Sequence, residues 1–451
     1  MHPTLFFIPY QIFGVPVFGL GILFVVWLLA LCAGCFFYWR SAEKKSWSEL
    51  IQTFLLMLAV GCVLCWGLPK AGCAAGIPVR AYGTMMLLGI LLATGLAVWR
   101  APRFGFRGEN ILEILLCLCV PGILGARIFY VIEYWEAFRA PTIGETFRRI
   151  IDIPGGGLVV YGSLIGGIIG AVTYLLIKRL SIRRMMDLLA PSLLLGLALG
   201  RIGCFLNGCC FGGVCDASHE HWGVHFPAGS PPFERQFEEN VLEYDLDGTY
   251  YGLRFAGDPL PSAPAPVFVA EVIPGSIAQK AGVMPGDYIL RLNGREFFSR
   301  GEVIKALVRE TRQEGMAVLE VSRLEGTVTC SWVTTANAGP VSLSVYPTQI
   351  YSSVNAFCLC GILLLWSWFR KNPKGIGMKL DGEVFALFLT LYPISRFILE
   401  MIRTDEADAF GTGLSISQNV SLILLLTAVC FWILLLIAGK KRKMNSDPPV
   451  G

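Results

Sequence analysis

The chain has 451 residues, of which 54% are hydrophobic and only 16% are charged. Soluble domains carry about 25% charged residues, so this composition excludes an ordinary soluble enzyme and favours a protein with many membrane spans. The net charge of +4 is too small to indicate a nucleic-acid partner, and none is expected.

Apolar segments near the length of a membrane span recur along the chain and predict an all-α polytopic membrane protein. Nine segments are expected as transmembrane helices: 13–38, 51–69, 82–100, 111–133, 157–177, 185–206, 350–369, 381–402 and 415–438. Basic residues cluster on one side of these spans, as at 100–107, 178–184 and 440–443, with Arg148 and Arg149 among the exceptions. The positive-inside rule therefore predicts an outer N-terminus and a cytoplasmic C-terminus.

The long segment 209–347 changes character and predicts a small α+β domain at 248–334, outside the cytoplasm. A helix is expected around 303–308, and alternating apolar residues predict strands at 267–272, 288–294, 317–323 and 328–333. The stretches GLRF (252–255) and VIPGSIAQKAGVMPGDYILRLNG (272–294) resemble a PDZ domain. The resemblance implies a peptide ligand that adds as a strand, and the alternative is a spacer or lid with an empty groove.

Costly polar side chains recur at one expected depth, near the outer ends of separate spans. They are Tyr82, Arg127, Tyr161, Arg201, Asn207, Arg396 and Glu400. Snorkelling to headgroups explains any one of them alone, whereas five spans together indicate one site. Because Tyr392, Arg396 and Glu400 are four residues apart, they share a helix face, and Arg396 can pair with Glu400.

Arginines at headgroup depth suit a phosphate, because guanidinium is permanently charged and bidentate toward phosphate oxygens. The glycines of GGGLVVYGSLIGGIIG (155–170), Gly162 among them, allow either close helix packing or the approach of a headgroup to the backbone.

The stretch GRIGCFLNGCCFGG (200–213) resembles the signature of the phosphatidylglycerol–prolipoprotein diacylglyceryl transferase family. Further matches follow in the family's order: IPVRAYGTMMLLGILLA (77–93), GARIFYVIEYW (125–135), GGLVVYGSLIGG (156–167), YPTQIYSS (346–353) and YPISRFILEMIR (392–403). The expected organisation is two additional N-terminal helices (1–76), a first core part (77–216), a linker (217–247), the PDZ-like domain (248–334), a second core part (335–440) and a tail (441–451).

The resemblance implies an enzyme of the bacterial cytoplasmic membrane that begins lipoprotein maturation. Its partners are phosphatidylglycerol, prolipoprotein signal peptides and the lipid bilayer. The diacylglyceryl group moves to the thiol of the signal-peptide cysteine, and glycerol-1-phosphate leaves. The transferred group is already activated, so no metal or organic cofactor is expected.

The resemblance also assigns roles. The expected catalytic residues are Arg201, Arg396, Tyr161 and Glu400, and the expected substrate-binding residues are Arg201, Tyr82, Arg127, Gly162, Asn207 and Tyr392. Tyr161 stands where many members have histidine, a candidate base for the thiol. Tyrosine has an ordinary pKa near 10, so either a neighbouring cation activates Tyr161, or it orients lipid and the base lies elsewhere.

Alternative functions remain open. Zinc, free thiols or disulfides are weighed for the cysteine-rich stretch, with the disulfides drawn from Cys209, Cys210, Cys215 and Cys330. An intramembrane metalloprotease or serine protease is disfavoured because all four histidines lie outside the expected spans. A PDZ-bearing membrane scaffold is the non-enzymatic alternative.

Overall fold

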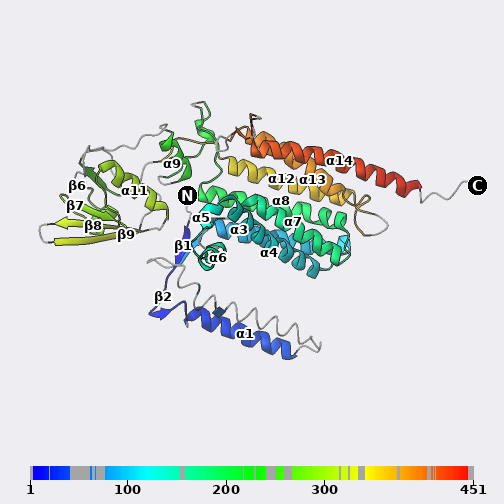
Figure 1. Ribbon diagram of the computed structural model, residues 1–451, viewed down its shortest axis with the longest axis horizontal. Coiled ribbons are helices and arrows are strands. Elements are labelled where there is room, and N and C mark those ends of the chain that lie inside the picture. The colour runs from blue at the N-terminus through cyan, green and yellow to red at the C-terminus, as the bar shows by residue number, and fades with distance from the viewer. Residues whose placement is uncertain are drawn as a thin grey trace, which may run out of the picture. The chain divides into compact units, whose positions relative to one another are not determined.

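The computed structural model describes most of the chain and divides it into two compact units (Figure 1). The first unit comprises residues 1–84 and 203–347, and the second comprises 85–202 and 348–451. The described residues are 4–19, 21–40, 61–62, 65, 67, 77–152, 157, 159–216, 218–227, 230–239, 250–257, 267–313, 316–323, 326–333, 341–372, 376–403, 408–409, 411 and 413–444. The expected span at 51–69 lies almost entirely outside them.

Long apolar helices make up the second unit. Its elements are α3 (Ala81–Arg100, which begins in the first unit), η3 (Ala101–Phe104), α4 (Gly108–Glu133), α5 (Trp135–Phe138), α6 (Ile143–Ile151), α7 (Val160–Ile177), α8 (Ile182–Asn207, which ends in the first unit), α12 (Thr348–Phe369), α13 (Glu383–Glu400), β10 (Asp408–Ala409), β11 (Leu414–Ser415) and α14 (Ile416–Met444). Within the described residues, five helices are long and apolar enough to cross a membrane: Ala81–Phe104, Gly108–Glu133, Ile182–Asn207, Thr348–Phe369 and Ile416–Lys440. This supports a polytopic membrane protein.

Glycines set the contact between α4 and α7, which run alongside each other (Figure 1). A side-chain carbon added at Gly162 would collide with the carbonyl of Gly125, and one at Gly166 with the carbonyl of Pro121. The two backbones therefore approach more closely than any larger residue allows, as at small-residue interfaces in membranes. The packing alternative for this glycine run is confirmed.

A buried carboxylate fixes the start of α13. Asp187 of α8 accepts hydrogen bonds from the backbone N–H groups of Gly382, at 2.6 Å, and Phe385, at 2.9 Å. These N–H groups have no partner within their own helix, so Asp187 caps α13 from a distant part of the sequence. The contact holds α13 against α8, and this positions the residues further along both helices.

The first unit begins with short strands before α1. β1 (Thr4–Ile8) pairs antiparallel with β4 (Ile77–Arg80), and β2 (Gln11–Ile12) pairs with β3 (Val15–Pro16). The expectation of one helix over 13–38 is therefore wrong at its start, because α1 (Ile22–Arg40) begins only after the hairpin. Left-handed backbone at Phe13 and Gly14 forms the turn that replaces the helix.

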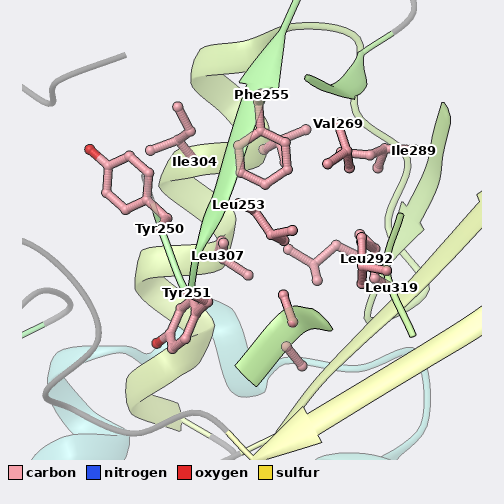
Figure 2. Close-up of a cluster of buried hydrophobic side chains, with 14 of the residues drawn as sticks. Tyr250, Tyr251, Leu253, Phe255, Val269, Ile289, Leu292, Ile304, Leu307 and Leu319 are labelled. Atoms are coloured by element: carbon pink, nitrogen blue, oxygen red, sulfur yellow. The ribbon is translucent and has the colours of Figure 1, made fainter. Parts of the chain in front are cut away.

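A five-stranded antiparallel sheet of order β5-β6-β7-β8-β9 also belongs to the first unit. Its strands are β5 (Leu253–Ala256), β6 (Phe268–Val272), β7 (Tyr288–Leu292), β8 (Met316–Arg323) and β9 (Gly326–Val333), with α10 (Ile277–Lys280) and α11 (Arg300–Gln313). Preceding pieces are η4 (Glu220–Trp222) and α9 (Pro231–Glu238). The four strands and the helix expected from the sequence are confirmed. Figure 2 shows Ile304 and Leu307 of α11 beside Leu253 and Phe255 of β5, all of them buried.

An ion pair locks the PGD turn of this domain. Arg323 of β8 reaches both oxygens of Asp287, at 2.6 and 2.7 Å, and the Met284 N–H donates to the same carboxylate. Burial acts to raise the pKa of Asp287, but the hydrogen bonds from Arg323 and Met284 outweigh it and hold the pKa below its ordinary value. The turn is thereby tied to the end of β8.

Candidate active site

A small cavity lies among α8, α12 and α13, lined by Arg201, Tyr392 and Arg396 with Leu197, Ser352, Asn355 and Leu399. Its volume is about 10 Å³, enough for one water molecule. Three residues expected at the site from separate stretches of sequence therefore share one cavity of the second unit. Asn355 and Ser352 also line it, and neither residue was expected there from the sequence.

Arg396 is held rigidly. Its Nη1 lies 2.5 Å from Oε2 of Glu400, and its Nη2 donates to Oγ of Ser417 on α14 at 2.9 Å. The Arg396 side chain is only 13% exposed and that of Glu400 is 2% exposed, so the pair is largely shielded from solvent. The pairing that their four-residue spacing predicts is confirmed. Ser417 was missed, because nothing in the sequence relates α14 to α13.

Arg201 is the less constrained of the two cations. It lies near the end of α8, half-buried, and it has no hydrogen bond or ion pair among the described residues. Its guanidinium is therefore available to a ligand. Arg396 supplies a fixed cation in the same cavity, and Arg201 supplies one whose side chain makes no hydrogen bond within the described residues.

The charge of the cluster is unbalanced. Arg403 also contacts Glu400, at 3.4 Å between Nη1 and Oε2, and its side chain is only 5% exposed. One carboxylate thus serves two arginines, and Arg201 adds a third positive charge beside them. Among the described residues of this cluster, three positive charges against one negative charge leave a net excess of two. An excess of buried positive charge favours an anionic ligand such as a phosphodiester.

Arg127, expected at the same site, has different neighbours. Its side chain is buried, and its guanidinium lies over the rings of Tyr130 and Phe138. It donates to four backbone carbonyls at 2.8–3.1 Å, those of Arg149, Ile150, Asp152 and Gly157. This arrangement holds the end of α6 and the chain leading into α7 against α4. Its hydrogen-bonding capacity is used within the protein rather than offered to a ligand.

The remaining expected residues differ in surroundings. Tyr161 is 48% exposed in the first turn of α7 and has no hydrogen bond or cation contact among the described residues. Gly162 faces Gly125 of α4 in the helix contact described above. Tyr82 is exposed near the start of α3, and Asn207 is the last residue of α8; both belong to the first unit. Their substrate contacts remain predictions.

Three thiols cluster at the end of α8, one in its last turn and two just after it. The sulfur atoms of Cys204, Cys209 and Cys210 lie within 4.8 Å of one another. None of the three forms a disulfide in the described part of the chain, and Cys330 is buried in the core of the sheet domain. Cys330 therefore serves as a core residue there. The chemistry of three adjacent thiols suits a soft metal or disulfide exchange, so those expectations stay open.

The apolar helices indicate a polytopic membrane protein, and the cavity between α8, α12 and α13 is lined by two arginines. Residues 71–434 match the family described as prolipoprotein diacylglyceryl transferase, and the chain therefore belongs to this family. A phosphatidylglycerol–prolipoprotein diacylglyceryl transferase of Rhodopirellula baltica is 32% identical, over 94% of this chain and 87% of the relative.

Two further relatives carry related names. A phosphatidylglycerol–prolipoprotein diacylglyceryl transferase of Clostridium tetani is 36% identical, over 78% of this chain and 92% of its own length. The enzyme named phosphatidylglycerol–prolipoprotein diacylglyceryl transferase 2 of Clostridium perfringens is 24% identical, over 81% of this chain and 95% of its own. The resemblance recognised in the motifs is confirmed along most of the chain.

Proposed function

We propose that this protein transfers the diacylglyceryl group of phosphatidylglycerol to the cysteine thiol of prolipoprotein signal peptides, at the cavity shared by Arg201 and Arg396. The family match and the names of the relatives support the reaction. The convergence of two arginines on one cavity with an excess of positive charge supports the location.

The reaction exchanges one carbon–oxygen bond for one carbon–sulfur bond. The cysteine sulfur attacks the diacylglyceryl carbon that carries the phosphodiester oxygen, and the thioether bond forms as the carbon–oxygen bond breaks. The electron pair of that bond stays on the departing glycerol-1-phosphate. The thiol proton passes to a base, so atoms and charge balance without an oxidant or reductant.

The arginines act on the departing phosphate. Negative charge grows on the phosphate oxygens as the carbon–oxygen bond breaks, and preorganised cations stabilise that charge more in the transition state than in the bound lipid. Arg396 is fixed by Glu400 and Ser417, so it needs little reorganisation at that moment. Glu400 is thus a positioning residue for Arg396.

Substrate entry requires the cavity to widen. A space of about 10 Å³ holds one water, whereas a phosphodiester headgroup is several times larger. Arg201, which has no partner among the described residues, is the cation that can swing aside and close on the lipid. Tyr392 lines the same wall and orients the headgroup.

Tyr161 fits an orienting role better than that of a base. A tyrosine that acts as a base needs a nearby cation to stabilise its anion, and no cation contacts Tyr161 among the described residues. Arg127 fits a supporting role, because it fixes the segment that leads to Tyr161. The lipid contacts of Tyr82 and Asn207 stay predictions from the resemblance, and Gly162 sets the approach of α7 to α4.

The membrane arrangement follows from the distribution of basic residues. Nine spans with an outer N-terminus and a cytoplasmic C-terminus place the Arg201 end of α8 on the outer side. The sheet domain then lies outside the cytoplasm. There the open edge of β5, with α11 packed beside it, suits strand addition by an extended peptide, as in a PDZ-like domain.

The decisive experiment compares two arginines of α8. The full-length chain, in phosphatidylglycerol vesicles, is given a prolipoprotein peptide, and thioether product is measured by mass spectrometry. Arg201→Gln should lower the rate by about 100-fold or more. Arg183→Gln, at the opposite end of α8 and exposed, should leave it unchanged.

Complementation supplies the second arm. The unmodified chain should rescue a bacterium depleted of its own transferase, and Arg201→Gln should fail to rescue while inserting normally. Transfer at the wild-type rate by Arg201→Gln would move the site elsewhere. Failure of the correctly inserted wild type to make product would remove the proposed activity.

A further inference from the structure

A second, larger cavity lies at the other end of the helical unit. Its volume is about 520 Å³, and α12 runs between it and the candidate active site. Ser352 and Asn355 of α12 line the small cavity, whereas Leu364, Leu365 and Trp368 line the large one. The 22 residues of α12 span roughly 33 Å, close to the hydrocarbon thickness of a membrane. Ser352 and Trp368, on the linings of the two cavities, are 16 residues apart on α12, or roughly 24 Å, so the large cavity lies toward the opposite membrane surface.

The polar part of this cavity is cationic. Arg103 and Lys371 are exposed on its lining, and no acidic residue lies among the described residues that form it. Neither cation has a carboxylate partner among the described residues. Lysine and arginine at the membrane surface attract anionic headgroups.

A buried arginine supports the wall behind these cations. Arg100 is 1% exposed and donates to the Leu188 carbonyl at 2.7 Å and to Oγ of Ser367 at 3.0 Å. These bonds join α3, α8 and α12. The cavity wall is thus built from fixed elements, with Arg103 and Lys371 at its accessible side.

The apolar part of the cavity suits lipid. Trp99, Trp368 and Leu365 are each about 60% exposed, at 62%, 60% and 58%. The guanidinium of Arg103 lies 4.5 Å from the centre of the Trp99 ring, which places charge and aromatic surface together. Tryptophan beside basic residues at a helix end is the arrangement found at the membrane–water interface.

We propose that this cavity binds the phosphate of an anionic phospholipid from the leaflet opposite the candidate active site. Arg103 and Lys371 hold the phosphate, and the start of an acyl chain lies along Leu365 and Trp368. A volume of about 520 Å³ accommodates a headgroup and glycerol, with the chains remaining in the bilayer. The bound lipid joins the ends of α3 and α12. The proposal does not depend on the transfer reaction.

The test measures lipid binding by the purified full-length chain in detergent, by native mass spectrometry and by the shift in thermal unfolding midpoint. The probes are dioctanoyl phosphatidic acid, dioctanoyl phosphatidylcholine and inorganic phosphate. Every protein carries Arg396→Gln, which removes the fixed cation of the other cavity. Against that background, Arg103→Gln with Lys371→Gln is compared with Arg183→Gln, an exposed arginine at the same end that does not line the cavity.

Phosphatidic acid should bind and raise the unfolding midpoint, and phosphatidylcholine should bind far more weakly. Each lost cation should weaken the binding about fivefold, so the double variant loses roughly 25-fold, while Arg183→Gln binds normally. Asn372→Asp, a nearly isosteric change on the lining, should also weaken binding, and it serves if the double variant fails to fold.

Three results would overturn the proposal. Unchanged binding in both lining variants would place the lipid elsewhere. An equal loss in Arg183→Gln would reduce the effect to general surface charge. Equal stabilisation by inorganic phosphate would identify the ligand as a free anion rather than a lipid.

Discussion

Two of the regions of the helical unit that contain shielded arginine use it differently. At the end of α4, Arg127 donates to four backbone carbonyls of its own protein. Toward the ends of α8 and α13, Arg201 and Arg396 line one cavity, and among the described residues a single carboxylate balances only part of the local positive charge.

The contrast shows that residue type and depth alone do not identify a ligand site. Arg127, Arg201 and Arg396 all lie in motifs of the same family, and each is costly to place in a membrane. What separates them is whether the protein itself satisfies the guanidinium. An arginine whose hydrogen bonds are made within the protein stabilises the fold. An arginine whose charge is only partly balanced by the protein is available to substrate.

The largest effect should come from Arg396, which lines the cavity with the excess of positive charge. Arg396→Ala removes the fixed cation and should lower the rate of transfer by about 10²- to 10³-fold, because the departing phosphate loses a preorganised donor. Initial rates in phosphatidylglycerol vesicles measure this. Arg396→Lys should recover only part of the rate, since lysine cannot replace a bidentate guanidinium. A wild-type rate in the folded alanine variant would show that Arg396 does not stabilise the departing phosphate.

The matching change at Arg127 should lower the stability of the fold instead. Arg127→Gln leaves backbone carbonyls without their donor and should cost about 3 kcal/mol of stability. The unfolding midpoint and the yield of folded protein measure this, with the exposed Arg139→Gln as control. The rate per folded molecule should stay within about twofold of wild type. A selective loss of rate with normal stability would instead make Arg127 a ligand residue.

Glu400 tests the role of charge balance at the cavity, because it pairs with two arginines. Glu400→Gln keeps the shape and removes the charge, which leaves Arg396 and Arg403 to repel each other. The value of kcat/KM should fall roughly tenfold. Glu383→Gln is a matched control, because Glu383 is an equally buried carboxylate at the other end of α13, paired with Arg370 at 2.9 Å. Equal losses of rate in both variants would indicate a purely structural effect.

Tyr161 should matter less than any of these. Tyr161→Phe removes only a hydroxyl that has no hydrogen-bond partner among the described residues, and transfer should fall by less than about threefold. The same vesicle assay measures the rate across pH. A loss near 100-fold, together with a displaced pH profile, would instead identify the tyrosine as the base.

The smallest effect on transfer is expected from the sheet domain. The pKa of Asp287 is lowered from 3.8, so its ion pair with Arg323 contributes stability above that pH and loses it as pH falls through the lowered pKa. Pepsin should therefore cleave segment 267–333 increasingly as the pH falls below about 4. Asp287→Asn should be cleaved more readily throughout and show little of this pH dependence, while transfer at neutral pH stays near wild type. Equal acid sensitivity in both proteins would rule out Asp287 as the cause.

Much of the site could be predicted from local spacing. The interval between Arg396 and Glu400 placed them on one helix face, and the structure confirms their pair. The strands of the sheet domain followed from alternating apolar residues. The hairpin at 11–16 was missed, because apolar residues there continue the pattern of the following helix while the turn at Phe13 and Gly14 breaks it.

Residues close together in the chain fix which segments are apolar enough for a membrane and which charges lie in them. They also make up the motifs that identify the family. Only the tertiary structure decided which charges are satisfied. The carbonyls around Arg127, the Ser417 partner of Arg396 and the Asp187 cap of α13 come from distant segments. A hydrogen bond needs its two atoms about 3 Å apart, and only folding brings residues from different helices to that separation.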